Sequence, residues 1–271
     1  MEKKIIYNSD KPIKFHFGHA NGFHPDVYKF FLDKLEGRVF ATLFKPFQQG
    51  AKPADLKTWE VIADEMIAVI EGNSNNHKVV GMGHSMGASS TVLAAIKRPD
   101  LFEKLILIEP VLLPRFVFVL QKVLPFSIFK KMVPVAKIAL KRKDKWADKQ
   151  TVFDSWRTKK IFRDIPNEIL KGLVEHNVVD DKNGVKLRYS KEWEAHIYAT
   201  VLNIWPLLPK LSMPVLAIRG VKTDVISDKD WTLWKKKCPS MQFLNVEHSG
   251  HLVPFEQPEV LVRSIKEFVA A

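Results

Sequence analysis

The five residues Gly-His-Ser-Met-Gly at positions 83–87 decide the fold of this 271-residue chain. A short run predicted as a buried strand, 77–83, precedes them, and an alanine-rich run predicted as a helix, 86–97, follows them. The serine is therefore predicted to lie on a sharp turn between a strand and a helix. Side chains clash in such a turn, and the two glycines remove those clashes. The alternative is a glycine-rich turn whose serine caps a helix. We favour the strained turn, which exposes the Ser85 hydroxyl as a nucleophile.

Strands alternate with helices on both sides of this turn. The continuous apolar strands are typical of a parallel sheet that is covered on both faces. Strands are predicted at 13–18, 38–44, 104–109, 214–220 and 241–246, and helices at 55–70 and 258–269.

One region interrupts the alternation, because 110–209 contains helical segments broken by prolines and no predicted buried strand. We therefore expect an α/β fold with a mostly parallel central sheet and helices on both faces. Its core comprises 1–109 and 210–271, and 110–209 forms an inserted helical cap.

A serine nucleophile needs a base, and nine histidines are available. His251 is the preferred candidate because it lies on a glycine-containing turn between the last predicted strand and the last helix. A loop there can reach Ser85 across the edge of the sheet. His248 competes for this role but lies nearer the end of the strand, where we favour a structural role.

The base needs an acid that orients its ring and stabilises the imidazolium. Two acids follow predicted strands, Asp224 after 214–220 and Glu109 at the end of 104–109. Both lie between the serine and the histidine, in the order Ser, acid, His that hydrolases of this type use. We favour Asp224, because its loop lies nearer the loop of His251. Glu109 is the alternative acid, or it lines the pocket or anchors the cap hinge.

Two backbone N–H groups are expected to stabilise an oxyanion. One belongs to Met86, which follows the nucleophile, and the other to Asn21, in the glycine-rich loop after the first core strand. His19 and His24 in that loop have no acidic or cysteine partner at ligand spacing, so no metal is expected.

The formal charge of +12 is concentrated in 115–163, where 14 Lys and Arg accompany three Asp. A basic surface attracts anions. A solvated helical face is the simplest interpretation, and a weak contact with an anionic membrane surface is the alternative. No nucleic-acid-binding motif is recognised, so no nucleic acid partner is expected. The single cysteine, Cys238, excludes an internal disulfide, and 1–8 contain no apolar leader. We therefore expect a cytoplasmic protein.

Five motifs of the chain belong together, namely His19-Ala20-Asn21-Gly22-Phe23, Gly83-His84-Ser85-Met86-Gly87, Leu107-Ile108-Glu109-Pro110, Thr223-Asp224 and Gly250-His251. In these motifs the chain resembles the capped bacterial serine α/β-hydrolases, in the branch of the epoxide hydrolases and haloalkane dehalogenases. The resemblance implies a catalytic triad and an ester-like substrate, and we expect no cofactor. Those two enzyme classes use an Asp where this chain has Ser85, so their reactions are not expected.

We therefore expect a serine hydrolase that cleaves small carboxylic esters through an acyl-enzyme on Ser85. The apolar and aromatic residues of the cap favour short or medium acyl chains. The alternatives are a lipase or thioesterase at a membrane surface and a non-catalytic ligand-binding homologue. The same fold and triad serve amidases, carbon–carbon bond hydrolases and haloperoxidases, so the sequence does not specify the natural substrate.

Overall fold

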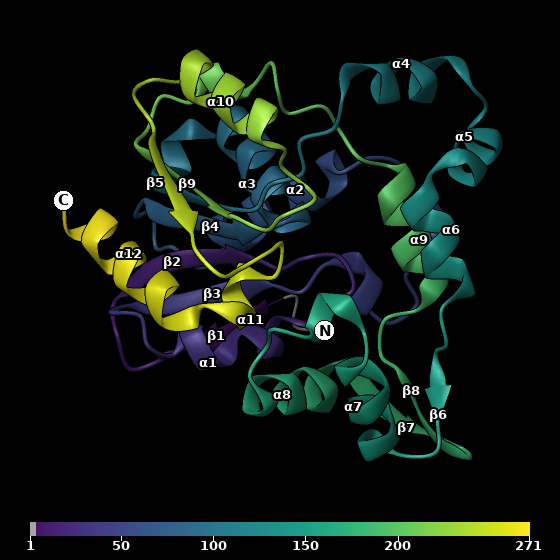
Figure 1. Cartoon of the computed structure of the whole chain (residues 1–271). Coiled ribbons are helices and arrows are strands. Elements are labelled where there is room, and N and C mark those ends of the chain that lie inside the picture. The colour runs from purple at the N-terminus through teal and green to yellow at the C-terminus, as the bar shows by residue number, and fades with distance from the viewer. Residues whose placement is uncertain (1–3) are drawn as a thin grey trace.

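A seven-stranded sheet forms the centre of the protein in a computed structural model that describes residues 4–271 (Figure 1). Residues 1–3 lie outside the described residues. They are the start of the segment 1–8, in which the sequence predicts no apolar leader. The strand order is β1-β3-β2-β4-β5-β9-β10, and every neighbouring pair except β1 and β3 is parallel. The strands are β1 (Lys4–Tyr7), β2 (Ile13–Gly18), β3 (Arg38–Thr42), β4 (Val79–His84), β5 (Phe102–Ile108), β9 (Val215–Gly220) and β10 (Gln242–Val246).

Both faces of the sheet are covered, because successive side chains along a strand point to opposite faces. On β5, Ile106 and Ile108 join one buried cluster, whereas Leu105 and Leu107 join the other. The first cluster packs under α1 (Lys29–Leu32), α11 (Val253–Glu256) and α12 (Pro258–Ala270). The second packs under α2 (Glu60–Glu71), α3 (Met86–Lys97) and α10 (Asp228–Lys237). The expected α/β core with helices on both faces is confirmed.

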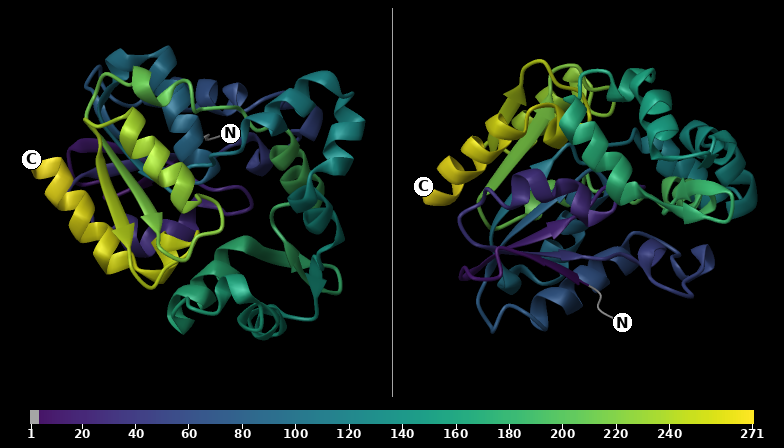
Figure 2. Two further views of the ribbon diagram at one scale, coloured as in Figure 1. Left: turned by 45° about the horizontal axis from the view of Figure 1, so that its top comes forward. Right: turned by 90° about the horizontal axis from the view of Figure 1, so that it is seen from below.

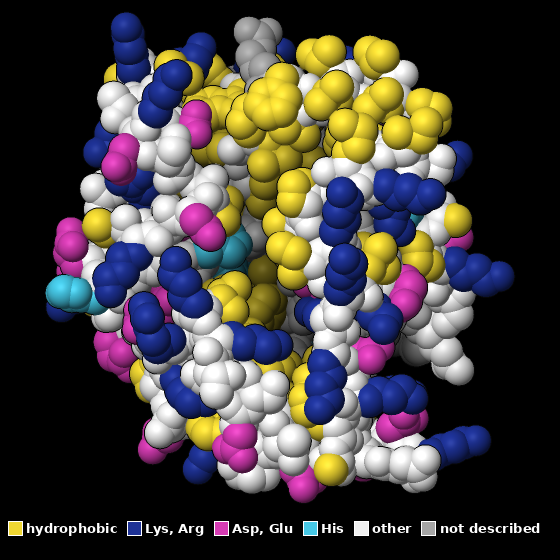
Figure 3. Space-filling view, turned by 45° about the vertical axis from the view of Figure 1, so that its right-hand side comes forward, with side chains coloured by type: hydrophobic (Ala, Val, Ile, Leu, Met, Phe, Trp, Pro, Cys, Tyr) yellow, Lys and Arg dark blue, Asp and Glu magenta, His cyan; other side chains and the backbone are white. Residues whose placement is uncertain are grey.

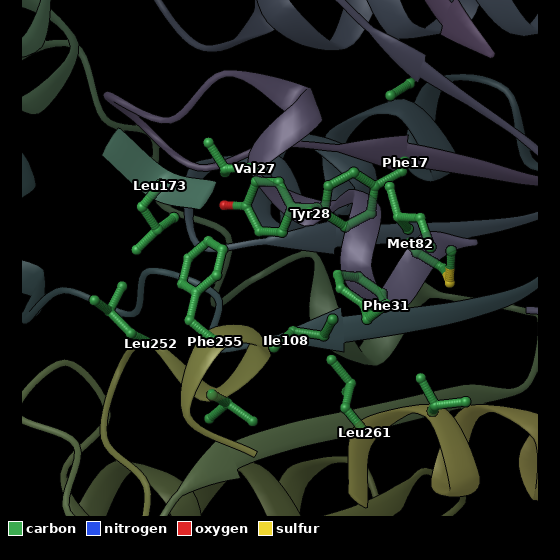
Figure 4. Close-up of a cluster of buried hydrophobic side chains, with 14 of the residues drawn as sticks. Phe17, Val27, Tyr28, Phe31, Met82, Ile108, Leu173, Leu252, Phe255 and Leu261 are labelled. Atoms are coloured by element: carbon green, nitrogen blue, oxygen red, sulfur yellow. The ribbon is translucent and has the colours of Figure 1, made fainter. Parts of the chain in front are cut away.

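The first cluster extends into the segment that follows β5 (Figure 4). The Tyr28 ring lies between Phe17 of β2 and Phe255 of α11, with ring centroids 4.8 and 4.9 Å away. Leu173 lies near Val27 in the same view and belongs to the same cluster. The inserted segment therefore shares a hydrophobic core with the sheet.

The inserted segment lies between β5 and β9, which are neighbours in the sheet (Figures 1 and 2). We call residues 110–209 the cap. Its helices are α4 (Arg115–Val123), α5 (Phe126–Met132), α6 (Pro134–Lys141), α7 (Lys149–Arg157), α8 (Asn167–Asn177) and α9 (Lys191–Ala199). Short 3₁₀ segments across the chain are Pro25–Tyr28, Lys45–Phe47, Pro53–Asp55, Pro99–Leu101, Lys160–Phe162 and Leu208–Lys210.

The cap is not purely helical, in contrast to the expectation. It contains a small antiparallel sheet of β6 (Lys145–Trp146), β7 (Val178–Asp181) and β8 (Gly184–Leu187). A two-residue turn joins β7 to β8, and Gly184 has a φ of 131° that other residues rarely adopt. These strands are short and few of their residues are buried, so the chain shows no buried apolar run that would predict them.

One helix boundary also differs from the prediction. The helix expected at 55–70 begins at Glu60, because Pro53–Asp55 forms a separate 3₁₀ segment. Asp55 accepts a hydrogen bond from the Lys52 backbone there, at 2.7 Å, and does not cap the helix. Within residues 4–271, no helix combines the length and the apolar character that crossing a bilayer requires.

The buried His16 predicts a pH-dependent stability. Its side chain is fully buried in β2, and burial lowers its pKa to about 3. The unfolded chain takes up a proton below about pH 6.5, whereas the folded chain does not, so stability falls as pH falls from 6.5 towards 3. We expect this group to remove about 2 kcal/mol of unfolding free energy between about pH 7.5 and about pH 5.

Urea unfolding of the wild type and of His16→Gln at both pH values isolates this effect. The wild type should lose more stability than the variant, because other titrating groups are common to both. Identical losses in the two proteins would contradict the assignment.

Candidate functional site

Ser85 lies on the turn between β4 and α3, in a strained backbone conformation with φ 55° and ψ −116°. The two flanking glycines are required by close backbone packing. A Cβ at Gly83 would lie 2.4 Å from the Gly87 carbonyl carbon, and one at Gly87 would lie 2.0 Å from the Gly18 oxygen. These distances are far below contact distance, so the turn accommodates only glycine at both positions. The expected strained turn is present, and it packs directly on the end of β2.

His251 lies in the loop between β10 and α11, and its ring reaches Ser85. The Nε2 atom lies 3.0 Å from the Ser85 Oγ, so the hydroxyl can donate to the ring. Ser85 is 8% exposed, and the His251 side chain is 19% exposed. The pair is thus accessible from one side while the protein surrounds the rest. The rival His248 is exposed, in the turn just after β10.

Glu109 holds the other ring nitrogen of His251. Its Oε2 lies 3.0 Å from His251 Nδ1 and accepts a hydrogen bond from the Thr223 hydroxyl at 2.7 Å. Its Oε1 accepts from the Gly220 N–H at 2.7 Å. The carboxyl group is fully buried, and a buried carboxylate needs such partners to offset the loss of hydration. Glu109 also has a φ of 51°, a strained value for this residue type.

The expectation that Asp224 orients His251 is wrong in its geometry. Asp224 is exposed, and His251 Nδ1, which it was expected to contact, is hydrogen-bonded to Glu109 instead. The loop after β9 contributes Thr223 instead, whose hydroxyl fixes Glu109. The carboxyl group that meets His251 therefore comes from the residue directly after β5, the neighbour of β4 in the sheet, and the loop after β9 supports it.

The two expected oxyanion donors lie beside the turn. Met86 is the first residue of α3, so its N–H has no acceptor within the helix. Asn21 follows β2, whose end packs against Gly87. The Asn21 side chain accepts from the Tyr189 hydroxyl at 2.8 Å and donates to the Glu194 carbonyl at 3.2 Å. Its backbone N–H forms no hydrogen bond within residues 4–271.

The cap therefore holds one wall of the site, since Tyr189 and Glu194 both belong to it. Further contacts fix α9 to the core. The Trp59 indole donates to the Ile197 carbonyl at 3.0 Å, and the His196 ring donates to the Leu56 carbonyl at 2.7 Å. Arg142 pairs with the Glu194 carboxyl group, whose pKa burial raises above its ordinary value.

A second histidine lies behind the site. His84 Nε2 lies 2.8 Å from the His251 carbonyl, which can only accept, so this nitrogen carries the proton. His84 Nδ1 then accepts from the Tyr28 hydroxyl at 2.8 Å, and the Tyr28 oxygen accepts from the Ala20 N–H at 3.2 Å. Burial lowers the pKa of His84 well below its ordinary value, which keeps the ring neutral. This series joins the loop of Asn21 to the loop of His251.

Two further features of the described residues lie outside this arrangement. No group of three His, Cys, Asp or Glu side chains in residues 4–271 is arranged to hold a metal ion. A surface cavity of about 600 Å³ lies beside α2, lined by Lys4, Val61, Asp64 and Asn73 among others. It includes neither Ser85 nor His251, so we assign it no part in the candidate site.

Comparison with known proteins identifies the family. The sequence model described as the alpha/beta hydrolase family matches residues 17–264. The chain belongs to the alpha/beta hydrolase family. It is thus a hydrolase by family, and the predicted membership of the α/β-hydrolases is confirmed.

The relatives of this α/β-hydrolase differ in their named activities. Ethanol acetyltransferase 1 of Hanseniaspora uvarum is 25% identical, over 98% of this chain and 81% of that protein. The Haemophilus influenzae protein named "Putative esterase/lipase" is 26% identical, over 78% of this chain and 67% of that protein. The solved structure of E-2-(acetamidomethylene)succinate hydrolase aligns with a TM-score of 0.79 at 19% identity, covering 96% of this chain and 92% of that one.

Sequence reasoning did not identify three groups that the site of this α/β-hydrolase uses. His84 lies inside the serine motif, but nothing local indicates that its ring meets the His251 carbonyl. Tyr28 and Thr223 are likewise single polar residues whose partners lie far away in the chain. Only the fold brings these groups together.

Glu109 and Asp224 provide a matched pair of substitutions. We expect Glu109→Gln to lower kcat for an accepted ester by about 10³- to 10⁴-fold, because the amide cannot stabilise the imidazolium or select its tautomer. Asp224→Asn should stay within about twofold of wild type, since its side chain is exposed and does not contact the ring. Steady-state kinetics with circular dichroism as a folding control measures both. Loss of activity in Asp224→Asn alone would overturn the assignment.

Tyr28 should be more important for stability than an ordinary buried tyrosine. Tyr28→Phe leaves the buried Ala20 N–H and His84 Nδ1 without their partner, which costs about 1–3 kcal/mol of unfolding free energy. Tyr198→Phe is the control, because the Tyr198 hydroxyl forms no hydrogen bond within residues 4–271. Urea unfolding of both variants compares them, and equal stability losses would refute the role of the series.

Proposed function

We propose that this α/β-hydrolase cleaves carboxylic esters through an acyl-enzyme on Ser85. The observation that carries the proposal is the continuous series Ser85 Oγ, His251 and Glu109, with 3.0 Å at both links. Each of the three groups has the role that its chemistry allows: a hydroxyl nucleophile, an imidazole base and a buried carboxylate that orients the base. A ligand-binding homologue without catalysis has no need for all three.

The first half of the reaction forms the acyl-enzyme. His251 Nε2 accepts the Ser85 proton while Oγ forms a bond to the carbonyl carbon of the ester. The N–H groups of Asn21 and Met86 stabilise the negative oxygen of the tetrahedral intermediate. The intermediate collapses as the ester C–O bond breaks, and His251 gives its proton to the leaving alcohol.

The second half releases the acid. His251 deprotonates a water molecule, which attacks the acyl carbon, and the bond to Ser85 Oγ breaks as the proton returns to the serine. The Glu109 carboxylate stabilises the imidazolium in both halves. An alcohol in place of water gives a new ester by the same steps, so acyl transfer is the second candidate activity. The named activity of the Hanseniaspora uvarum relative favours its inclusion.

We propose that the acyl group is apolar and of short or medium length. Hydrophobic side chains line a hollow between the core and the cap, and a histidine side chain lies at its wall (Figure 3). An apolar surface binds an alkyl chain by removing it from water, at about 0.8 kcal/mol per buried CH₂ group. As the sequence predicts, we propose a cytoplasmic enzyme.

Ser85→Ala tests the mechanism directly. We expect kcat to fall by about 10⁶-fold on p-nitrophenyl esters, because the nucleophile acts as one unit with its base. A fluorophosphonate probe should label the wild type and not the variant. Wild-type turnover in Ser85→Ala would exclude the mechanism, and an unlabelled wild type would favour a ligand-binding protein.

The same assay tests the substrate class. A p-nitrophenyl series from acetate upwards should reach its highest kcat/KM at short or medium chains. Absence of turnover at every length removes the ester proposal. Adding ethanol and measuring the ratio of ethyl ester to free acid separates hydrolysis from acyl transfer.

A further inference from the structure

An apolar stripe on α4 faces solvent. Phe116, Val119, Leu120 and Val123 are 64%, 59%, 37% and 73% exposed. Their spacing of three and four residues puts them on one face of the helix. In a surface helix such a stripe normally packs against the protein. Here only Phe118 of the same helix is buried, at 8% exposure, so the larger apolar face of α4 has no partner within the described chain.

The exposed apolar surface continues across α5 and α6. Ten of the 14 large hydrophobic side chains exposed in residues 4–271 lie in 116–140. Figure 3 shows hydrophobic side chains gathered at the upper right, where α4 and α5 lie. Scattered apolar residues on a surface are ordinary, but a contiguous patch marks an interaction site. The members on α5 and α6 are Phe126, Ile128, Met132, Val135, Ile138 and Leu140.

The charge of this surface selects its partner. Residues 110–143 contain eight Lys and Arg and no Asp or Glu. Within residues 4–271, all six lysines of the region form no ion pair, namely Lys122, Lys130, Lys131, Lys137, Lys141 and Lys143. Free cations beside exposed apolar side chains match a surface that offers both anionic groups and a hydrocarbon layer.

A second copy of this chain fits poorly, because pairing two such faces brings lysines opposite lysines with no acidic residue to compensate. A bilayer with anionic phospholipids meets both requirements. The short helices α4, α5 and α6 can lie flat with their apolar side chains about 5–10 Å into the headgroup boundary. The lysine stems extend along the apolar layer while their ammonium groups reach the phosphates.

We propose that the α4–α6 face of the cap is a docking surface for anionic phospholipid bilayers. The face is anchored to the rest of the protein through α9. The Gln121 amide donates to the Ala199 and Val201 carbonyls at 3.2 and 3.1 Å, and α5 and α6 pack on α9. Because α9 also holds Asn21 through Glu194, docking fixes the orientation of the candidate site at the lipid surface. Docking itself does not depend on ester hydrolysis.

Vesicle co-sedimentation tests the proposal with the full chain. We expect binding to vesicles of equal parts phosphatidylcholine and phosphatidylglycerol, little binding to pure phosphatidylcholine, and release at high salt. Each lysine near the surface contributes about fivefold to the partition coefficient. Lys122→Gln/Lys131→Gln/Lys137→Gln should therefore bind on the order of 10- to 100-fold more weakly.

The control removes the same charge from the far end of the cap. Lys160, Lys171 and Lys182 are exposed and form no ion pair within residues 4–271. Lys160 lies in the 3₁₀ segment Lys160–Phe162, Lys171 lies on α8, and Lys182 lies in the turn between β7 and β8. Their triple Gln variant should bind vesicles as the wild type does. Equal losses in both triple variants would show attraction by net charge alone and would overturn the docking surface.

An apolar variant tests the other half of the surface. Phe116→Ser/Val123→Ser/Ile138→Ser keeps every lysine and alters only side chains more than 60% exposed, so the fold should persist. We expect it to lose binding to the anionic vesicles at least tenfold. Unchanged binding, or a wild type that forms a dimer broken by this variant and ignores vesicles, would overturn the proposal.

Vesicle binding and ester hydrolysis can be tested independently of each other. Hydrolysis of a water-soluble ester without vesicles should be equal in the wild type and the lysine variant. Vesicle binding by a wild type that hydrolyses no ester would remove the proposed activity and leave the docking surface intact.

Discussion

The buried carboxyl group of Glu109 is the interaction on which the arrangement of the site depends. It accepts hydrogen bonds from the backbone of Gly220 at the end of β9, from Thr223 in the loop after β9, and from His251 in the loop after β10. A charge without these partners could not remain buried, because the loss of hydration would exceed any gain from packing. The same three bonds that stabilise the carboxylate therefore fix the histidine ring over Ser85.

The cap takes part in this arrangement through the loop after β2. Tyr189 and Glu194 hold the Asn21 side chain, and the series from Ala20 through Tyr28 and His84 ends on the His251 carbonyl. The loop of the expected oxyanion donor is thus bonded on one side to the cap and on the other to the loop of His251. A movement of the cap would act on the geometry at Ser85 through these bonds.

The inner and outer faces of the cap differ in what they contact. Its inner face completes the core cluster and the site, as Leu173 and Tyr189 do. Its outer face, at α4–α6, carries exposed apolar side chains and lysines that the interior does not use. The prolines that break this region into short helices let the chain bend around the core while the apolar stripe of α4 stays outside. One insertion therefore provides both a wall of the site and a surface for a partner.

The sequence by itself determined the turn at Ser85, the loop of His251 and the alternation of strands and helices in the core from β2 onwards, because local sterics and side-chain periodicity specify them. It offered both Glu109 and Asp224 as the carboxyl group that contacts His251, and it favoured Asp224, whereas the structure places Glu109 there. The His251 ring lies 142 positions after Glu109 in the chain, so the sequence does not show which carboxyl group it meets. Only the packing of β5 beside β9 decides this. Packing likewise decided the small sheet of the cap and the solvent-facing side of α4, since an apolar stripe at helical spacing is the same in sequence whether it faces the core or the solvent.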